Sequence, residues 1–497
     1  FFAAGGQILS VGAFPGYSSG SKARLEALRT CVLHTDRSEV RTRLAEQKRL
    51  TLSIAQHGQE LETISYLQRE TEQGTILFLV NHAKDQSYDA VLTVYGVSSC
   101  VTALTAEDGE MHPISYRIAE GNTESCLHFE PMGSHLLLLQ PTTVSAYQVE
   151  EPQIQTVKME ANWTVERMDL NTLTLDYCSY RIDGGAVQGP LPVIKLQELL
   201  LQLQHPCSLE LYFEFDVDID LDSNREFCVV IEEAQLYEVS INGNSVSTQN
   251  LDWWKDKSFY KVSIKPYVQN GKNQLVLTTR FQQPQKVYDV LFGDDVYETE
   301  KNKITYEIEI EAIYLLGDFG VRSRNPYQKL ARGAMVTEGP FVVVDAPTEF
   351  RTPDFTTSGL LFFAGTMELS QILSVKKEAG KKIVLDFGSQ RAPLVKVYLN
   401  RSLIKDSMWA PYCADITDAV AEGDNLLTIQ IFASNRNLLG PHHHIDGECY
   451  QVGPESFTGT WSWVERTSEA DATDIADQTK NYWTDTYSFV EFGFSET

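Results

Sequence analysis

The fold is decided by residues 237–278, which read YEVSINGNSVSTQNLDWWKDKSFYKVSIKPYVQNGKNQLVLT. Apolar and polar residues alternate from Tyr237 to Ile241, which is the pattern of a strand with one buried face. Asn242-Gly243 follows, and both residues tolerate the positive φ that a tight hairpin turn requires. The stretch therefore predicts short antiparallel strands joined by turns.

A similar pattern returns about 150 residues later, a spacing that indicates a duplicated domain rather than a solenoid unit. Residues 395–431 read VKVYLNRSLIKDSMWAPYCADITDAVAEGDNLLTIQI. Val262-Ser263-Ile264 matches Ala414-Asp415-Ile416, and Gly271-Lys272-Asn273 matches Gly423-Asp424-Asn425. We therefore predict two related β-sandwiches in the C-terminal two thirds of the chain.

The rest of the 497-residue chain divides by pattern, because a chain this long exceeds a single hydrophobic core. We expect a mainly β protein. The predicted parts are the tail of an α/β domain (1–60), a small antiparallel β-sandwich (61–141), a linker (142–160), and two large sandwiches (161–340 and 341–497).

Two local patterns sharpen the first large sandwich. Leu196, Leu199, Leu200 and Leu203 share one stripe of a predicted helix that Pro206 closes. Apolar residues then alternate with acidic ones over 209–221, which predicts a long strand whose apolar side chains all face inward.

Charge and cysteine content limit the partners. The formal net charge of −27 disfavours nucleic acid and anionic membrane surfaces, since phosphate binding needs a basic face. Neutral ligands such as sugars remain compatible. The 8 cysteines are scattered and form no C-x-x-C pair, so a zinc ribbon is disfavoured. Scattered cysteines in apolar segments also favour free thiols, and thus a reducing compartment such as the cytoplasm.

The chain begins FFAAGG, without Met, and continues into a short strand-like run at 7–14 and helix-like runs from Ser21 and near Ser38. This start is typical of the interior of a domain. We therefore expect an upstream part of the protein to precede Phe1.

Several segments resemble a known class of proteins. LTLDYCSYRIDGG, INGNSV, DWWKDKSF, NLLGPHHH and YSFVEFGF resemble the galactose-binding-like jelly-roll modules of large bacterial glycoside hydrolases (residues 173–185, 241–246, 252–259, 437–444 and 487–494). The resemblance is to family 106 α-L-rhamnosidases and to the family 2 sugar-binding domain. TILFLVNHAKDQSYDAVLTVYG, residues 75–96, resembles the small sandwich that often follows their catalytic barrel.

This resemblance implies two jelly-roll sandwiches, a carbohydrate ligand and an upstream (β/α)-barrel that carries two catalytic carboxylates. No catalytic residue of that barrel matches a position of this sequence, so the catalytic residues stay unknown.

The Trp-Trp loop is the first candidate for sugar binding. Trp253 and Trp254 offer flat rings for the apolar face of a sugar, and Asp256 offers an acceptor for its hydroxyls. The second copy carries Trp409 and Tyr412 at the related place. The alternative is that one Trp plugs the end of a sandwich or packs on a neighbouring domain.

The second candidate is the loop-rich end. His442, His443 and His444 precede Asp446 and Glu448, and Trp461 follows. Imidazoles and carboxylates this close could bind a metal, but adjacent residues rarely point at one ion. A structured loop is the favoured interpretation, with a sugar contact from His443, His444 or Trp461 next and zinc last.

Asp216, Asp218 and Asp220 lie on one face of the predicted long strand. Like charges there repel, and a calcium ion would relieve the repulsion. A solvated face, or pairing with Lys and Arg, is the favoured alternative. We therefore expect no cofactor, with structural calcium as the exception to test.

These patterns lead to one leading hypothesis. The chain is the accessory, carbohydrate-binding half of a glycoside hydrolase, α-L-rhamnosidase-like, acting on plant or complex glycans. The alternative is a stand-alone carbohydrate-binding or scaffold protein without catalysis. A third hypothesis is a hydrolase with its own site between the sandwiches.

Overall fold

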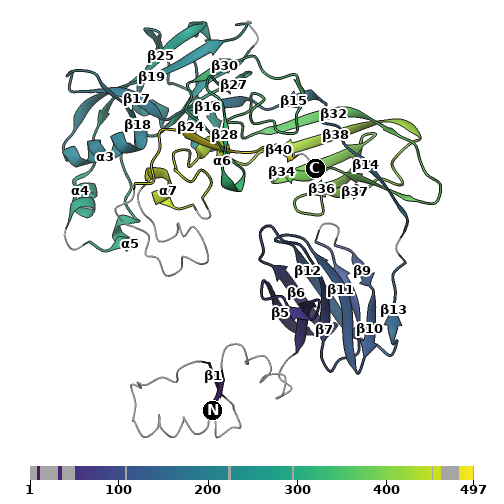
Figure 1. Cartoon of the computed structure of the whole chain (residues 1–497). Helices are drawn as coiled ribbons and strands as arrows, with labels where there is room; N and C mark the ends of the chain where they lie inside the picture. Colours follow the sequence, from purple (N-terminus) through teal and green to yellow (C-terminus); the bar gives the residue numbers. More distant parts are fainter. Residues whose placement is uncertain are drawn as a thin grey trace, which may run out of the picture. The chain divides into compact units, whose positions relative to one another are not determined.

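The computed structural model describes residues 8–11, 32–35, 51–106, 109–150, 152–221, 225–293, 296–449, 452–459 and 481–495. The chain forms two compact units, residues 1–152 with 409–411, and residues 153–408 with 412–497. Antiparallel sheets dominate both units, which confirms the prediction of a mainly β protein (Figure 1). Among the described helices, none has the length and apolar character that crossing a membrane requires.

At the N-terminus, β1 (Ile8–Val11) pairs in parallel with β2 (Val32–Thr35). A parallel pair is what an α/β segment contains, and the strand predicted at 7–14 is present. The two helix-like runs lie outside the described residues.

The small sandwich consists of a six-stranded sheet, β13-β10-β11-β7-β3-β4, and a five-stranded sheet, β5-β6-β12-β8-β9. Its core holds fully buried side chains such as Leu79, Phe129 and Leu137. The strands are β3 (Leu52–Gln56), β4 (Gln59–Glu60), β5 (Ile64–Thr71), β6 (Gly74–Asn81), β7 (Tyr88–Val94), β8 (Ser99–Leu104), β9 (Met111–Ile114), β10 (Tyr116–Ala119), β11 (Asn122–Phe129), β12 (Ser134–Pro141) and β13 (Ala146–Tyr147).

The first large sandwich pairs a five-stranded sheet, β16-β26-β20-β24-β23, with an eight-stranded sheet. The larger sheet runs β18-β17-β19-β25-β21-β22, with β30 beside β19 and β27 beside β30. The strands are β16 (Asn171–Leu175), β17 (Tyr177–Ile182), β18 (Gln188–Pro192), β19 (Cys207–Asp218), β20 (Phe227–Glu232), β21 (Glu238–Ile241), β22 (Asn244–Val246), β23 (Trp253–Trp254), β24 (Asp256–Ser263), β25 (Gly271–Phe281), β26 (Ile313–Gly317), β27 (Gly320–Ser323) and β30 (Phe341–Val344).

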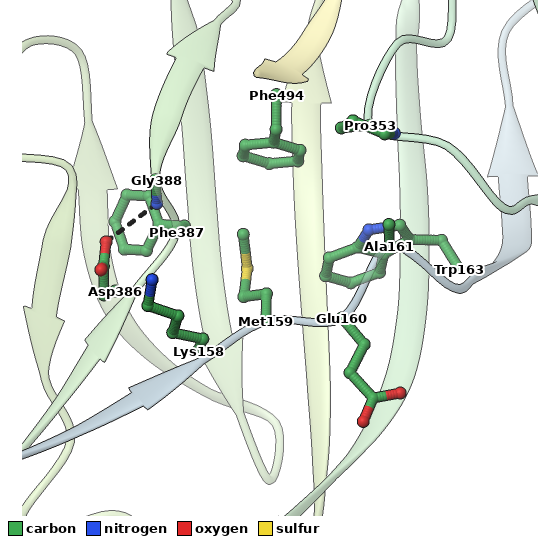
Figure 2. A pocket seen from close by; sticks show the side chains of 10 residues that line it. All are labelled: Lys158, Met159, Glu160, Ala161, Trp163, Pro353, Asp386, Phe387, Gly388 and Phe494. Atoms are coloured by element: carbon green, nitrogen blue, oxygen red, sulfur yellow. Dashed lines mark hydrogen bonds between the residues drawn. The ribbon is translucent and has the colours of Figure 1, made fainter. Parts of the chain in front are cut away.

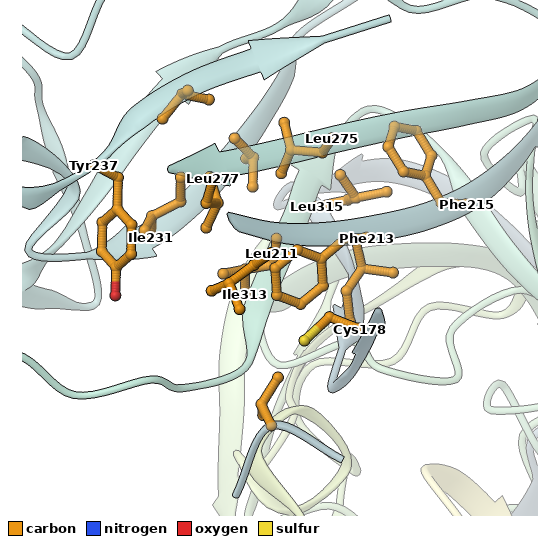
Figure 3. Packing of buried hydrophobic residues seen from close by; sticks show 14 of the residues in the cluster. Cys178, Leu211, Phe213, Phe215, Ile231, Tyr237, Leu275, Leu277, Ile313 and Leu315 are labelled. Atoms are coloured by element: carbon orange, nitrogen blue, oxygen red, sulfur yellow. The ribbon is translucent and has the colours of Figure 1, made fainter. Parts of the chain in front are cut away.

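The core of this sandwich lies between its two sheets (Figure 3). Leu211, Phe213 and Phe215 of β19 point toward Ile313 and Leu315 of β26 from the facing sheet. Burying a Leu or Phe side chain contributes about 1.5–3 kcal/mol. The inward alternation predicted for 209–221 is confirmed up to Ile219.

Leu221, the last residue of that alternation, does not face inward as predicted. The strand ends at Asp218, and Leu221 is 42% exposed. The described pairing of β19 with β25 ends at Val217, so beyond the strand the period-2 pattern no longer determines which residues are buried.

The second large sandwich combines a six-stranded sheet, β31-β15-β32-β38-β35-β36, with the sheets β14-β33-β37 and β34-β40. Its strands are β14 (Ile154–Lys158), β15 (Trp163–Met168), β31 (Glu349–Phe350), β32 (Thr366–Val375), β33 (Lys382–Asp386), β34 (Ser389–Arg391), β35 (Leu394–Leu399), β36 (Ser402–Ser407), β37 (Cys413–Asp415), β38 (Gly423–Phe432) and β40 (Gly493–Ser495).

The chain thus enters the second sandwich at β14 and β15, leaves it to form the first, and returns at β31. We expected residues 142–160 as a linker and 161–168 in the first sandwich. Instead, β14 pairs in parallel with β33, and β15 pairs with β32. Sequence pattern shows which residues form strands but does not show partners this distant.

The predicted duplication is visible in strand order. The order β18-β17-β19-β25-β21-β22 in the first sandwich corresponds to β31-β15-β32-β38-β35-β36 in the second. Asn273 and Asn425 occupy equivalent turns, and each donates to the carbonyl of a glycine two residues earlier, at 3.0 Å and 2.9 Å. The matched Gly-x-Asn triplets therefore serve one turn geometry in both copies.

The predicted helix is α3 (Val193–Leu203), with Leu196 and Leu200 fully buried against the first core. The other α-helices of the described ranges are short: α4 (Gln285–Phe292), α5 (Glu298–Lys301), α6 (Arg436–Leu439) and α7 (Pro454–Thr458).

The C-terminal segment joins the two large sandwiches. Strand β39 (Tyr487–Val490) pairs with β29 (Ala334–Thr337), which also pairs with β28 (Gln328–Lys329). Phe489 lies in the first core and Phe494 in the second. This segment brings residues from the end of the chain to the wall of the first sandwich.

Candidate functional site

A cavity of about 750 Å³ opens in the wall of the first large sandwich, where the C-terminal segment crosses it. This volume lies within the usual range for small-molecule sites. Apolar side chains form part of its lining, namely Leu173, Leu175, Phe215, Pro190, Pro340 and Phe341. Charged side chains form a second part, namely Asp176, Glu214, Asp216, Lys272, Arg324, Glu338 and Asp485, and Thr174, Tyr177, Gly339 and Tyr487 complete the lining.

Asp176 is the most enclosed carboxylate of the cavity. It follows β16 directly, and both its oxygens have partners. Oδ1 accepts a hydrogen bond from the Tyr487 hydroxyl at 2.6 Å, and Oδ2 lies 3.0 Å from Nε2 of His443. Burial alone raises the pKa of Asp176, but the hydrogen bond and charge of His443 and the Tyr487 hydroxyl outweigh burial and lower this pKa below its ordinary value.

The surroundings of His443 assign its protons. Nδ1 lies 3.0 Å from the carbonyl oxygen of Thr484 and 3.1 Å from that of Thr486. Carbonyl oxygens only accept, so Nδ1 carries a proton. Nε2 lies 3.0 Å from Oδ2 of Asp176, a carboxylate oxygen that also accepts, so Nε2 carries a proton as well. The geometry therefore holds His443 as an imidazolium.

Three aromatic rings surround this imidazolium. The ring centroid of Trp483 lies 4.6 Å from that of His443 in a stacked arrangement, and those of Tyr487 and Tyr177 lie 4.5 Å and 5.4 Å away. Aromatic faces attract cations, which compensates for part of the cost of burying the charge. Asp176 and His443 thus form a fixed ion pair, of which Asp176 lines the cavity.

Asp485 is held in place by two side chains through one of its oxygens. Its Oδ1 accepts hydrogen bonds from the Tyr177 hydroxyl at 2.8 Å and the Trp483 indole N–H at 3.0 Å. The hydrogen bond from Trp483, and after it the one from Tyr177, lowers the pKa of Asp485. The side chain is exposed, and within the described part of the chain no bond to its Oδ2 is found. Oδ2 is therefore oriented and available to accept.

The lining also carries charges of both signs. Arg324 lies 3.0 Å from Asp216, and Lys272 is the register partner of Asp216 across β19 and β25. Glu214 and Glu338 are exposed in the same cavity. Carboxylates outnumber cations in the lining, so the cavity disfavours acidic ligands.

The lowered pKa values of Asp176 and Asp485 determine what these two carboxylates can do in the cavity. Glycoside hydrolysis normally needs a carboxylic acid with a raised pKa that protonates the leaving group. The pKa values of Asp176 and Asp485 are both lowered instead, so these groups are ionised at neutral pH. They accept hydrogen bonds and do not supply protons.

The predicted Trp-Trp loop lies elsewhere on the first sandwich. Trp253 is 54% exposed on the edge strand β23, whereas Trp254 is half-buried, with its ring centroid 6.4 Å from that of Tyr314. Asp256 is exposed and accepts hydrogen bonds from the backbone N–H and hydroxyl of Ser258. Sugar binding by these three residues stays a prediction.

The related residues of the second copy differ in exposure. Trp409 is 48% exposed, and Tyr412 packs partly buried against the second core. Trp461 lies outside the described residues. Neither Trp409 nor Tyr412 belongs to the cavity lining described above, and a sugar contact from any of the three residues stays a prediction.

The three consecutive histidines are buried, each in its own contacts. His444 stacks on Tyr482 with ring centroids 5.4 Å apart, while His443 reaches Asp176. Burial lowers the pKa of His442 to about 4. No group of three or more metal-ligating side chains gathers in the described ranges, and Asp216 is paired with Arg324.

Sequence reasoning did not select Asp176, Asp485 or Arg324. Asp176 lies in a quoted motif, LTLDYCSY, where an acid between two strands was a usable signal. Its partner His443 lies 267 residues further along, so no local pattern could join them.

Comparisons with known proteins give no family assignment. No family model matches the sequence, and no curated protein matches it significantly. Similar solved structures include a rhamnosidase from Novosphingobium sp. PP1Y, with 15% identity and a TM-score of 0.24, covering 62% of this chain and 31% of that one. Another is Streptomyces avermitilis alpha-L-rhamnosidase complexed with L-rhamnose. It has 10% identity and a TM-score of 0.20, and the match covers 77% of this chain and 36% of that one.

A beta-glucuronidase from Bifidobacterium dentium, complexed with coumarin-3-O-glucuronide, has 10% identity and a TM-score of 0.18. The match covers 57% of this chain and 44% of that one. These structural neighbours are glycoside hydrolases, and the chain spans less than half the length of each. At such TM-scores the likeness decides neither the activity nor the site of this chain.

Proposed function

We propose that this chain is the accessory, carbohydrate-binding part of a glycoside hydrolase of the α-L-rhamnosidase-like kind. The observation that carries the proposal is the cavity beside Asp485, with apolar walls and oriented, ionised acceptors. The sequence resemblance to galactose-binding-like modules supports the same function.

A sugar ring would use both kinds of lining. Its C–H face packs on apolar side chains such as Phe341, while its hydroxyls donate to Asp485 and Glu338. Arg324 remains able to donate to a ring or glycosidic oxygen, since only one of its nitrogens faces Asp216. The excess of carboxylates disfavours uronic acids and sulfated sugars.

The proposal includes a catalytic partner. An upstream barrel of the same protein would perform the hydrolysis, and the sandwiches would hold the glycan beside it. Binding by the sandwiches would raise the local concentration of glycan near that barrel.

A glycan array followed by titration calorimetry tests the proposal. We expect binding of neutral glycans, weakened by about tenfold or more in Asp485→Asn, because the amide replaces an acceptor with a donor. Glu238→Gln, an exposed change on β21 outside the cavity lining, is the matched control. Absence of binding to any glycan by the folded protein would overturn the proposal.

The same preparation separates the other hypotheses. Turnover of aryl glycosides by this chain alone would show that it is itself a hydrolase. Glycan binding by a natural protein that starts near Phe1 would support a stand-alone binding protein instead.

A further inference from the structure

A second cavity lies in the second large sandwich, where the chain crosses from β14 to β15 (Figure 2). Its volume is about 380 Å³, and it shares no lining residue with the Asp485 cavity. Its lining consists of Lys158, Met159, Glu160, Ala161, Trp163, Pro353, Asp386, Phe387, Gly388 and Phe494.

The floor of this cavity is apolar and is built from buried rings. The rings of Trp163 and Phe494 stack with centroids 6.3 Å apart and planes 19° apart, and Phe387 is 3% exposed beside them. Met159 and Pro353 complete the apolar surface that Figure 2 shows around the opening. Such a surface suits the flat C–H face of a ring better than a chain of charged groups.

One polar group of this floor has no protein partner. Trp163 is 2% exposed, yet no hydrogen bond to its indole N–H is found within the described ranges. The indole nitrogen is not among the fully buried polar atoms of the described residues that lack a partner, so water or a ligand can reach it. A ligand oxygen in this cavity would satisfy it.

The rim carries charges of both signs. Asp386 accepts one hydrogen bond, from the backbone N–H of Gly388 at 2.9 Å, and this bond leaves its second oxygen available. Across the described residues, no bond to the Lys158 ammonium or the Glu160 carboxylate is found. The rim therefore offers one strong donor and two acceptors.

From this geometry we infer that the cavity binds one pyranose ring of a neutral glycan. The apolar floor takes the C–H face, the Trp163 indole N–H donates to a ring or hydroxyl oxygen, and the rim charges bond the remaining hydroxyls. A purely apolar ligand would bury the rim charges without partners, and an ionic ligand would meet repulsion from one side of the rim. The volume suits a ligand of this size.

This site rests on its own lining and not on the Asp485 cavity. If both bind, one chain holds a glycan at two points, and the linked sites strengthen retention without any new contact. The two sites can be tested separately because no residue belongs to both.

Saturation-transfer NMR with methyl pyranosides of glucose, galactose and rhamnose tests the inference. The test protein carries Asp485→Asn, so that binding in the other cavity is weakened. Ala161→Trp, added to it, fills the second cavity from an exposed position without disturbing the core. We expect transfer to at least one pyranoside, and at least a tenfold loss of binding when Ala161→Trp is present.

The indole N–H resonance of Trp163, assigned with Trp163→Phe, gives a second readout. We expect the pyranoside to shift it in the Asp485→Asn protein and not after Ala161→Trp is added. Equal binding with and without Ala161→Trp, or no binding by the Asp485→Asn protein, would overturn the inference whatever the Asp485 cavity does.

Discussion

The carboxylate of Asp176 lies 3.0 Å from the imidazole of His443, and the two residues are 267 positions apart in the sequence. Asp176 follows a strand of the first large sandwich, whereas His443 lies in the loop that precedes the C-terminal segment. Both side chains are largely buried, with 14% and 7% of their surface exposed. Their contact therefore fixes the wall of the candidate site from two distant parts of the chain.

Removing one partner of this pair should be strongly destabilising. His443→Gln leaves the Asp176 carboxylate buried without its cation, and breaking a buried pair in this way costs about 3–5 kcal/mol. We expect a clear loss of thermal stability in the unit formed by residues 153–408 and 412–497. Scanning calorimetry measures this loss.

The double change Asp176→Asn with His443→Gln supplies the control. It removes both charges, so we expect a smaller loss than the sum of the two single changes. Additive losses would contradict the assignment of His443 as an imidazolium paired with Asp176.

His442 makes stability depend on pH in a defined window. Burial lowers its folded-state pKa to about 4, while an exposed histidine titrates near 6.5. Below pH 6.5 the unfolded chain binds a proton that the folded chain does not, so stability is full above 6.5 and falls as pH drops toward 4. The loss reaches about 3 kcal/mol, since each pKa unit is about 1.4 kcal/mol.

Thermal unfolding between pH 8 and pH 4 checks this prediction. His442→Asn should flatten the decline for the larger unit. His135, whose pKa burial also lowers, lies in the other unit and serves as the internal reference. An unchanged slope in His442→Asn would show that other groups cause the decline.

A third prediction concerns the acidic side chains beside β20 and β26. Partial burial, followed by the charges of Glu232 and Glu309, raises the pKa of Glu311. Because the pKa of Glu311 is higher in the folded state than in the unfolded state, its contribution to stability is present at low pH and is lost as the pH rises. Glu311→Gln should therefore raise the melting temperature slightly at pH 8 and change it little at pH 4. A lower melting temperature at pH 8 would mean that the charge is stabilising.

The sequence predicts those parts of the fold that depend on neighbouring residues. The alternation along 207–218 and the Gly-x-Asn turns at 271–273 and 423–425 are local patterns, and each predicts its element. The insertion of the first sandwich into the second is not local, because β14 finds β33 only in the folded chain. The cavity around Asp485 requires the same long-range contacts, so composition and spacing could not locate it.

The two adjacent tryptophans should differ when each is changed to alanine. Trp254 is half-buried against Tyr314 and lies beneath the Lys255 ammonium, 5.2 Å from its ring centroid. Replacing a fully buried Trp by Ala typically lowers the free energy of unfolding by about 3–5 kcal/mol, and Trp254→Ala should lower it by about half as much. Trp253→Ala, at an exposed position, should leave the melting temperature nearly unchanged. Equal effects would contradict this difference, and calorimetry together with glycan titration would separate packing from sugar binding.

The duplicated asparagines allow a matched test of the repeat. Asn273 is 2% exposed and Asn425 is 1% exposed, and each accepts a backbone N–H from four residues earlier, at 2.9 Å and 2.8 Å. Each also receives a second asparagine side chain, from Asn242 at 2.9 Å and Asn400 at 2.8 Å. Alanine at either position leaves these buried groups unpaired.

An unpaired buried group costs about 1–3 kcal/mol, so Asn273→Ala and Asn425→Ala should each destabilise by similar amounts. Asp is the sharper substitution, because it keeps the accepting oxygen and removes the donor to the glycine carbonyl. We expect Asn273→Asp and Asn425→Asp to be destabilising as well, measured by urea unfolding. A large loss for one copy and none for the other would show that the shared turn has kept its sequence but not its structural role.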